Sequence, residues 1–279
     1  MSQARGAAEP PARIGFGAGR LPGCPSQAAA TSVLRRAVEL GVQLIDTADI
    51  YGDGLSELRI ADALYPYPAH LTIATKGGFV RGPDGPVPDG RPAHLRAACD
   101  GSLQRLRLDV IDLYQLHTPD PRVPFEESVG ALGELREAGK IRHVGLSQVT
   151  AEQLALARRL TAVASVQNGY NVRRRRRFGP DPVLGECERS GIAYLAFHPL
   201  AAGRLAGDKA ASEIARRLGA TAGQVALAWL LGQSETIVPI PGTRTVQHLE
   251  ENMAAARVRL EAADIARLAR PPTPGADGG

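Results

Sequence analysis

The sequence predicts an α/β protein folded as a single (β/α)8 TIM barrel, with its active site at the carboxyl ends of the strands. Short apolar runs alternate with amphipathic segments at intervals of about 25–40 residues, which is typical of βαβ units and a parallel sheet. Eight such runs can be distinguished, the number that closes a parallel barrel. No linker rich in proline and glycine divides residues 13–260. A chain of 279 residues with 44% hydrophobic content is large enough to fill one such core.

The predicted strands are short, apolar and often β-branched, as strands buried on both faces should be. They are Arg13–Gly17, Val42–Asp46, Leu71–Thr75, Val110–Leu116, His143–Leu146, Val163–Gln167, Ile192–Phe197 and Thr236–Ile240. An open doubly wound sheet is the competing architecture. It is disfavoured because Gly15-Phe-Gly17-Ala-Gly19 lacks the GxGxxG spacing and opens no helix.

The segments between these runs carry the signals of helix ends. Gln27–Leu40 stops before Gly41, Pro92–Arg107 begins at a proline, and Thr150-Ala-Glu-Gln153 is a capping box. The further predicted helices are Pro124–Ala138, Ala151–Leu160, Ser212–Leu218, Thr221–Leu231 and Thr245–Ala256. The segment 83–92, rich in Pro, Gly and Asp, is expected to be a loop. Residues 13–270 should therefore form the barrel, with residues 1–12 and 271–279 as disordered tails.

Four polar residues stand at or just after the ends of successive predicted strands. Asp46 ends one strand, and Lys76 and His117 directly follow the next two. Tyr51 lies five residues after Asp46. Because the carboxyl ends of barrel strands share one rim, these side chains can meet there. An acid, a phenol, an amine and an imidazole placed together can transfer a proton to a carbonyl oxygen. Singly, each has an ordinary structural explanation, such as a helix cap or a packed ring; the combination favours catalysis.

One segment, Asp46-Thr-Ala-Asp-Ile-Tyr51-Gly-Asp-Gly-Leu-Ser-Glu57, resembles the D-x-A-x-x-Y-G-x-x-x-S-E signature of the aldo-keto reductase family. Further segments resemble the same family in the same order: Ala74-Thr-Lys76, Asp112-Leu-Tyr-Gln-Leu-His117, Gly145-Leu-Ser147, and Ile240-Pro-Gly-Thr243 through Glu250-Glu251-Asn252. The resemblance spans roughly residues 13–260. Three other segments, Tyr65-Pro-Tyr67-Pro, Val166-Gln-Asn-Gly-Tyr-Asn171 and Gln224-Val-Ala-Leu-Ala-Trp-Leu230, look like those of a bacterial subgroup that includes pyridoxal reductases and tailoring oxidoreductases of secondary metabolism.

This resemblance implies an NAD(P)H-dependent oxidoreductase that reduces aldehydes or ketones to alcohols. Carried over residue by residue, it implies Tyr51 as the general acid/base and His117 as the group that orients the carbonyl. It implies Lys76 and Asp46 as the pair that tunes Tyr51. The chemistry agrees, because an ordinary phenol has a pKa of about 10 and a nearby ammonium favours its phenolate form. A buried lysine in turn needs a counter-charge, which Asp46 can supply.

The resemblance also implies where the nicotinamide lies. Ser147, Gln148 and Gln167 match the positions that hold its carboxamide, with Gln148 standing where Asn is usual. Phe197 matches an aromatic residue that stacks on the nicotinamide ring. The residues that follow it are His198, Pro199 and Leu200. His198 stands where the family often has Ser, and it either lines the cofactor site or only packs.

A phosphate site is predicted after the last strand. Gly242, Thr243 and Arg244 precede a helix, and a helix N-terminus binds anions. Barrels often bind phosphate at this position, and a guanidinium such as that of Arg244 can pair with a 2′-phosphate. The resemblance also implies that Glu251 and Asn252 contact the adenine, and with His248 they complete the predicted cofactor-binding set. We therefore expect NADPH rather than NADH as the cofactor.

The composition limits the classes of ligand and partner that we expect. A net charge of +4 and a pI of 9.2 fit an anionic ligand such as a dinucleotide. With 4% aromatics and no recurring basic-aromatic motif, nucleic acid is not expected. Three cysteines without metal spacing predict no metal site. With no signal peptide or membrane-spanning run recognised, we expect a cytoplasmic protein that takes a small-molecule carbonyl substrate. The sequence does not give the oligomeric state.

Some alternatives stay open. A nucleotide-binding barrel that acts as a non-catalytic regulatory subunit would have the same motifs. A sugar-phosphate isomerase or lyase on this fold would bind no nicotinamide. The run Arg173–Arg177 is expected to be a solvated, mobile loop, or else to recruit an anionic substrate or cofactor phosphate at the barrel mouth.

Overall fold

The computed structural model describes residues 13–203 and 207–270. Both tails that were predicted to be disordered lie outside these ranges. The strands are β1 (Phe16–Gly17), β2 (Leu44–Asp46), β3 (Thr72–Gly77), β4 (Phe79–Gly82), β5 (Gly85–Pro88), β6 (Ile111–Leu116), β7 (Ile141–Ser147), β8 (Val163–Gly169), β9 (Ala193–Phe197) and β10 (Ile237–Pro239). The α-helices are α1 (Gln27–Glu39), α2 (Leu55–Leu64), α3 (Pro92–Leu106), α4 (Phe125–Glu137), α5 (Ala151–Leu160), α6 (Val172–Phe178), α7 (Pro182–Ser190), α8 (Lys209–Leu218), α9 (Ala222–Leu231), α10 (Val246–Ala254) and α11 (Ala262–Ala269). A short 3-10 helix, Ala18–Gly23, follows β1.

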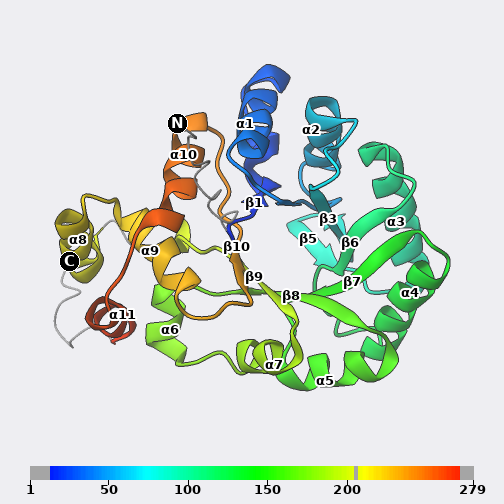
Figure 1. Cartoon of the computed structure of the whole chain (residues 1–279). Helices are drawn as coiled ribbons and strands as arrows, with labels where there is room; N and C mark the ends of the chain where they lie inside the picture. The colour runs from blue at the N-terminus through cyan, green and yellow to red at the C-terminus, as the bar shows by residue number, and fades with distance from the viewer. Residues whose placement is uncertain (1–12, 204–206, 271–279) are drawn as a thin grey trace, which may run out of the picture.

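Within the described residues, eight strands form one sheet in the order β1-β2-β3-β6-β7-β8-β9-β10, and each pair of neighbours is parallel. The sheet curls, and helices α1 to α7 lie around its outer side (Figure 1). Each of the eight predicted runs contributes a strand, although the bounds differ by a few residues. The predicted α/β fold with a parallel sheet is therefore confirmed.

The ladder of strands stays open between β1 and β10, so the prediction of a fully closed barrel is met only in part. Two backbone hydrogen bonds bridge this opening. The Gly15 N–H donates to the Pro239 carbonyl at 2.9 Å, and the Gly17 N–H donates to the Pro241 carbonyl at 3.1 Å. A parallel ladder would also need the N–H of residue 241 to donate back, and proline has none. The backbones still come close, because a Cβ atom on Gly17 would lie 2.6 Å from the Ile240 carbonyl oxygen.

Inside the curled sheet, an apolar layer lies below a polar one. The apolar layer is the buried cluster of Ala74, Leu113, Leu195 and Ile240. Residues two positions apart on a strand point to the same face. Two positions beyond Ala74 and Leu113 therefore come Lys76 and Gln115, which are both fully buried. This alternation places charged and amide groups in the interior near the carboxyl ends of the strands.

The main apolar core lies between the sheet and its helices. Its largest fully buried side chains include Trp229 of α9, Tyr114 of β6 and Tyr194 of β9. Burying a large apolar side chain completely contributes roughly 1.5–3 kcal/mol. None of the helices in the described ranges is long and apolar enough to cross a membrane.

Most predicted helices are present, and the capping boxes at Thr150 and Thr221 both form. Helices α2 and α7 were not predicted. The predicted loop 83–92 was wrong in part, because β4 and β5 pair there as an antiparallel hairpin. The prolines of β5 are tolerated because each strand of a two-stranded ribbon has one unpaired edge, where a missing backbone N–H breaks no ladder hydrogen bond.

The run of five arginines is helical, which corrects the expectation of a solvated, mobile loop there. Asn171 caps α6 by accepting from the Arg174 N–H. Arg176 is largely buried; it forms an ion pair with Asp208 and donates to the Leu268 carbonyl. Ion pairing and capping thus offset the repulsion within the run and fix it against α8 and α11.

Candidate active site

The predicted site residues gather around one cavity of about 980 Å³ at the carboxyl ends of the parallel strands. The predicted residues that line it are Asp46, Tyr51, His117, Ser147, Gln148, Gln167, Phe197, His198, Pro199, Leu200, Gly242, Thr243, Arg244, His248, Glu251 and Asn252. Lys76 is the one predicted residue outside this lining, and it lies buried behind Asp46 and Tyr51. The strand ends therefore bring all the predicted residues to one place.

Lys76 has no exposed surface. Its ammonium donates to Asp46 Oδ2 at 2.8 Å and to the Thr47 carbonyl at 2.7 Å, and it lies 3.5 Å from the Tyr51 hydroxyl. Burial is the largest single effect and lowers the pKa of Lys76, but the charges and hydrogen bonds of Asp46 and Tyr51 together outweigh it and leave the pKa above its ordinary value. The amine is therefore a cation at neutral pH, held within reach of the Tyr51 oxygen.

Asp46 is hydrogen-bonded through both carboxylate oxygens. Oδ2 accepts from Lys76, while Oδ1 accepts from the side-chain amides of Gln115 at 3.0 Å and Gln167 at 2.7 Å. The side-chain amide nitrogen of Gln167 also lies 3.4 Å from the side-chain oxygen of Gln115. Removing one partner of such a buried pair typically costs about 3–5 kcal/mol, because the other charge is left without compensation.

His117 packs edge-on against two aromatic rings. Its ring centroid lies 5.7 Å from that of Tyr51 and 4.7 Å from that of Phe79, with both pairs at 83°. Its Nδ1 is buried and has no hydrogen-bond partner among the described residues. Burial, and after it the charge of Lys76, holds the pKa of His117 well below its usual value. The imidazole is therefore neutral at physiological pH.

Another part of the cavity wall is the segment between β10 and α10. The Thr245 hydroxyl caps α10 by accepting from the His248 N–H. Arg244 is exposed and donates to the Gly23 carbonyl at 3.1 Å. A capped helix N-terminus beside an exposed guanidinium is a favourable place for an anion.

Two residues of the cavity wall have left-handed backbones. Gln148 has φ 59° and His198 has φ 49°. The Gln148 amide nitrogen donates to the His117 carbonyl at 3.2 Å, so its nitrogen is already engaged by the protein. The His198 carbonyl accepts from Asn171 at 3.0 Å, which links the cavity wall to the start of α6.

Several residues of the site were not predicted. The fully buried Gln115 was missed, although its position two residues before His117 on one strand places it on the inner face. Lining residues that were also missed are Gly17, Gly19, Arg20, Gly203, Gly223, Ile240, Pro241 and Thr245. Four of these residues are glycines, and a glycine has no side chain whose chemistry could mark it in a sequence as part of a site.

Comparisons with known proteins identify the family of the chain. The aldo/keto reductase family matches residues 13–270. Pyridoxine 4-dehydrogenase of Escherichia coli is 41% identical over 261 residues, covering 89% of this chain and 90% of that protein. A thermostable aldo-keto reductase in complex with the inhibitor epalrestat superposes with a TM-score of 0.80 at 30% identity, covering 96% of this chain and 98% of that one.

A further solved structure is an aldo/keto reductase from Klebsiella pneumoniae in complex with NADP and acetate. It has a TM-score of 0.80 at 28% identity and covers 93% of this chain and 92% of that one. The match of the family covers nearly all the described residues, and the relatives are matched over most of their own length. The chain therefore belongs to the aldo/keto reductase family and is an NAD(P)H-dependent oxidoreductase.

Proposed function

We propose that the protein is an NADPH-dependent reductase of small aldehydes or ketones. A bound NADPH would supply the hydride for the carbonyl carbon, and Tyr51 would give its hydroxyl proton to the carbonyl oxygen, which yields the alcohol. The observation that carries this proposal is the buried Lys76 ammonium, 3.5 Å from the Tyr51 hydroxyl and compensated by Asp46.

Each neighbour of Tyr51 has a task in this scheme. The phenolate that forms when Tyr51 loses its proton is stabilised by the adjacent Lys76 charge. Asp46 keeps Lys76 charged and in place. His117, neutral and at the cavity wall, can donate a hydrogen bond to the carbonyl oxygen and so orient it. In the reverse direction Tyr51 accepts the proton of the alcohol.

The residues around the cavity fit a dinucleotide. The cavity volume of about 980 Å³ is at the upper end of the usual range for ligand sites. The Gln167 amide nitrogen faces Asp46, which leaves its carbonyl oxygen to accept from a nicotinamide carboxamide. Ser147 and Gln148 would complete that contact, and Phe197 would offer a ring for stacking.

Arg244 supports the choice of NADPH. Its guanidinium is exposed beside the N-terminus of α10, where Thr243 also lines the cavity. A guanidinium and a helix N-terminus both stabilise a phosphate, and only NADPH carries a 2′-phosphate on the adenosine ribose. Glu251 and Asn252 would lie along the adenine.

The substrate is proposed more broadly. Pyridoxine 4-dehydrogenase, at 41% identity, acts by its name on pyridoxine. We therefore include pyridoxal, the aldehyde counterpart, among small aldehydes that carry a ring and polar substituents.

The experiment is NADPH oxidation followed at its absorbance maximum with pyridoxal, small aromatic aldehydes and aliphatic aldehydes. We expect saturable, aldehyde-dependent oxidation of NADPH. Tight NADPH binding without turnover on any aldehyde would favour the regulatory-subunit alternative. A protein that binds no nicotinamide at all would contradict the proposal.

A further inference from the structure

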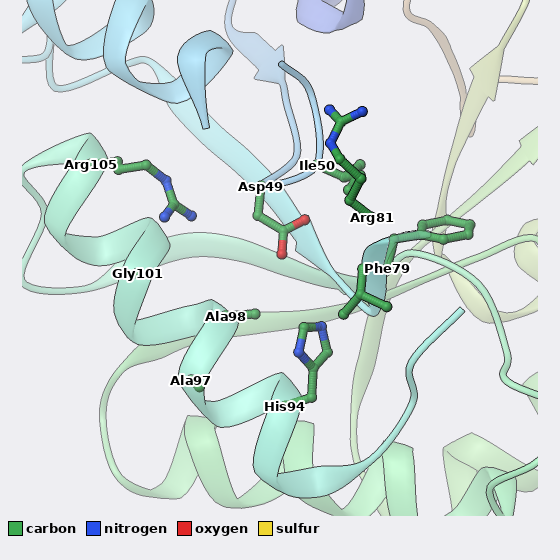
Figure 2. A pocket seen from close by; sticks show the side chains of 10 residues that line it. Asp49, Ile50, Phe79, Arg81, His94, Ala97, Ala98, Gly101 and Arg105 are labelled. Carbon is green, nitrogen blue, oxygen red and sulfur yellow. The ribbon is translucent and has the colours of Figure 1, made fainter. Parts of the chain in front are cut away.

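A second cavity, of about 380 Å³, is lined by residues of the loop after β2, of β4 and of α3 (Figure 2). Asp49 and Ile50 line it directly before Tyr51 in the chain, and Phe79, whose ring packs on His117, lines it as well. The remaining wall is formed largely by α3. The proposed reaction uses none of the residues that line this cavity.

Small residues of α3 make the hollow. Ala97, Ala98 and Gly101 succeed one another along the side of the helix that lines the cavity. Larger side chains at these positions would fill it. A compound bound here would therefore lie with its apolar part against the methyl groups of Ala97 and Ala98, while the Arg105 guanidinium lies against Gly101.

Two polar atoms in this cavity lack partners. Asp49 Oδ1 and His94 Nε2 are buried, and neither has a hydrogen-bond partner within residues 13–203 and 207–270. Figure 2 shows Asp49 entering from the loop after β2 and His94 rising toward it from α3. A buried polar atom without a partner costs about 1–3 kcal/mol. A ligand that donates hydrogen bonds at this place would recover that energy.

The charges around the cavity are unequal. Arg105 pairs with the buried Glu57 at 2.6 Å, and Arg81 pairs with Asp53 at 2.7 Å. Both guanidiniums that line the cavity are thus matched by a carboxylate. Asp49 has no ion-pair partner among the residues that the structure describes, so the cavity keeps one acid without a cation.

The surroundings of Asp49 also favour a positively charged ligand. Burial, followed by the negative charge of Glu57, raises the pKa of the Asp49 carboxyl to about 7, while a hydrogen bond from the Ile50 backbone and, after it, the charges of Arg105 and Lys76 oppose this to a smaller extent. The ionised form is therefore short of positive charge. A ligand that brings a positive charge would stabilise it and displace its proton.

We propose that this cavity binds a small organic ammonium compound. Its charged nitrogen donates to Asp49, and its apolar body lies on Ala97 and Ala98. His94 offers a further polar contact. An organic cation fits better than an inorganic one, because the cavity offers one carboxylate and an apolar surface rather than several oxygen ligands.

Binding in the second cavity would affect the first cavity. The Asp49 N–H donates to the Lys76 carbonyl at 3.2 Å, and Tyr51 follows two residues later. A cation bound to the Asp49 carboxylate would therefore act on the loop that holds Tyr51 near Lys76. Occupancy should change turnover without competing with NADPH or aldehyde, which makes the cavity a regulatory site.

The test titrates benzylamine into the full chain by isothermal calorimetry at pH 7, with benzyl alcohol and benzoate as size-matched neutral and anionic probes. We expect saturable binding of benzylamine, and binding of the other two that is weaker by about tenfold or more. In buffers of different ionisation enthalpy, benzylamine binding should release a fraction of a proton. Equal binding of the three probes, or no saturable binding, would overturn the proposal.

Three variants locate the binding. Asp49→Asn keeps the shape but removes the charge, so it should weaken benzylamine by about tenfold and abolish the proton release. Ala97→Leu fills the cavity mouth from an exposed position and should abolish binding. Tyr51→Phe alters only the first cavity and should leave the affinity within about twofold. Unchanged binding by Asp49→Asn and Ala97→Leu, both shown to be folded by thermal denaturation, would refute the site.

Discussion

The ammonium of Lys76 lies 3.5 Å from the hydroxyl of Tyr51, although Lys76 itself is fully buried. A lysine can stay charged in such a place only if an acid accompanies it. Asp46 fills that role at 2.8 Å, and it is fixed in turn by two amides. The relationship between Lys76 and Tyr51 thus depends on a network that reaches across four strands.

The first prediction concerns that network. Lys76→Met leaves Asp46 buried without a cation, although both amides still donate to it. We expect turnover to fall by about a hundredfold or more, and the free energy of unfolding to fall by about 3–5 kcal/mol. Steady-state NADPH oxidation and urea denaturation measure the two effects.

The double variant Asp46→Asn/Lys76→Met separates the two effects. It removes both charges, so most of the lost stability should return while turnover stays low. If turnover returned together with stability, the role of Lys76 would be structural only.

The second prediction concerns Gln115, which the sequence did not reveal as part of the site. Gln115→Leu removes one donor to Asp46 and frees the Gln167 amide to turn. We expect kcat/KM for NADPH to fall by about fivefold to tenfold, which corresponds to the roughly 1 kcal/mol of one hydrogen bond. Gln115→Glu should be worse, because it sets a second carboxyl against Asp46. Wild-type kinetics in both variants would show that Gln115 positions nothing.

The third prediction concerns the cofactor. Arg244→Ala should raise the KM for NADPH by about tenfold or more and leave the KM for NADH unchanged, since the guanidinium pairs only with the additional phosphate. Arg173→Ala, which removes the same charge from an exposed position on α6, is the matched control and should change neither value. An equal loss for both cofactors would argue against a 2′-phosphate contact.

The fourth prediction concerns acid stability. The pKa of His117 is held below its value in the unfolded chain, so the native imidazole stays neutral where the unfolded one takes up a proton. Its contribution to stability is therefore complete above the unfolded pKa of about 6.5 and is lost as the pH falls below it. Denaturation midpoints measured from pH 8 to pH 5 should fall less steeply in His117→Gln than in the wild type. Parallel slopes would contradict this.

Much of the fold could be predicted because its signals are local. Apolar runs mark the strands, and capping boxes such as the one at Thr150 mark helix starts. The grouping of Asp46, Lys76 and His117 followed from their places at strand ends, because a parallel sheet brings such ends to one rim.

The rest depends on contacts between distant segments. The open ladder between β1 and β10 follows from the position of Pro241 opposite Gly15 and Gly17, and the pairing of the two edges is not written in either segment. In the sequence, α6 resembles a charged loop, because Asp208, the ion-pair partner of Arg176, belongs to a distant segment. In the sequence, Gln115 is a single polar residue in an apolar strand, and only the structure shows that it contacts Asp46.

The most direct measurement of the central claim is the rate of NADPH oxidation by Tyr51→Phe, with NADPH affinity measured on the same preparation. The change removes one hydroxyl and leaves the ring beside His117. We expect NADPH binding within about twofold of the wild type and a loss of turnover of about 10²–10⁴. Turnover close to that of the wild type would contradict the assignment of Tyr51 as the proton donor.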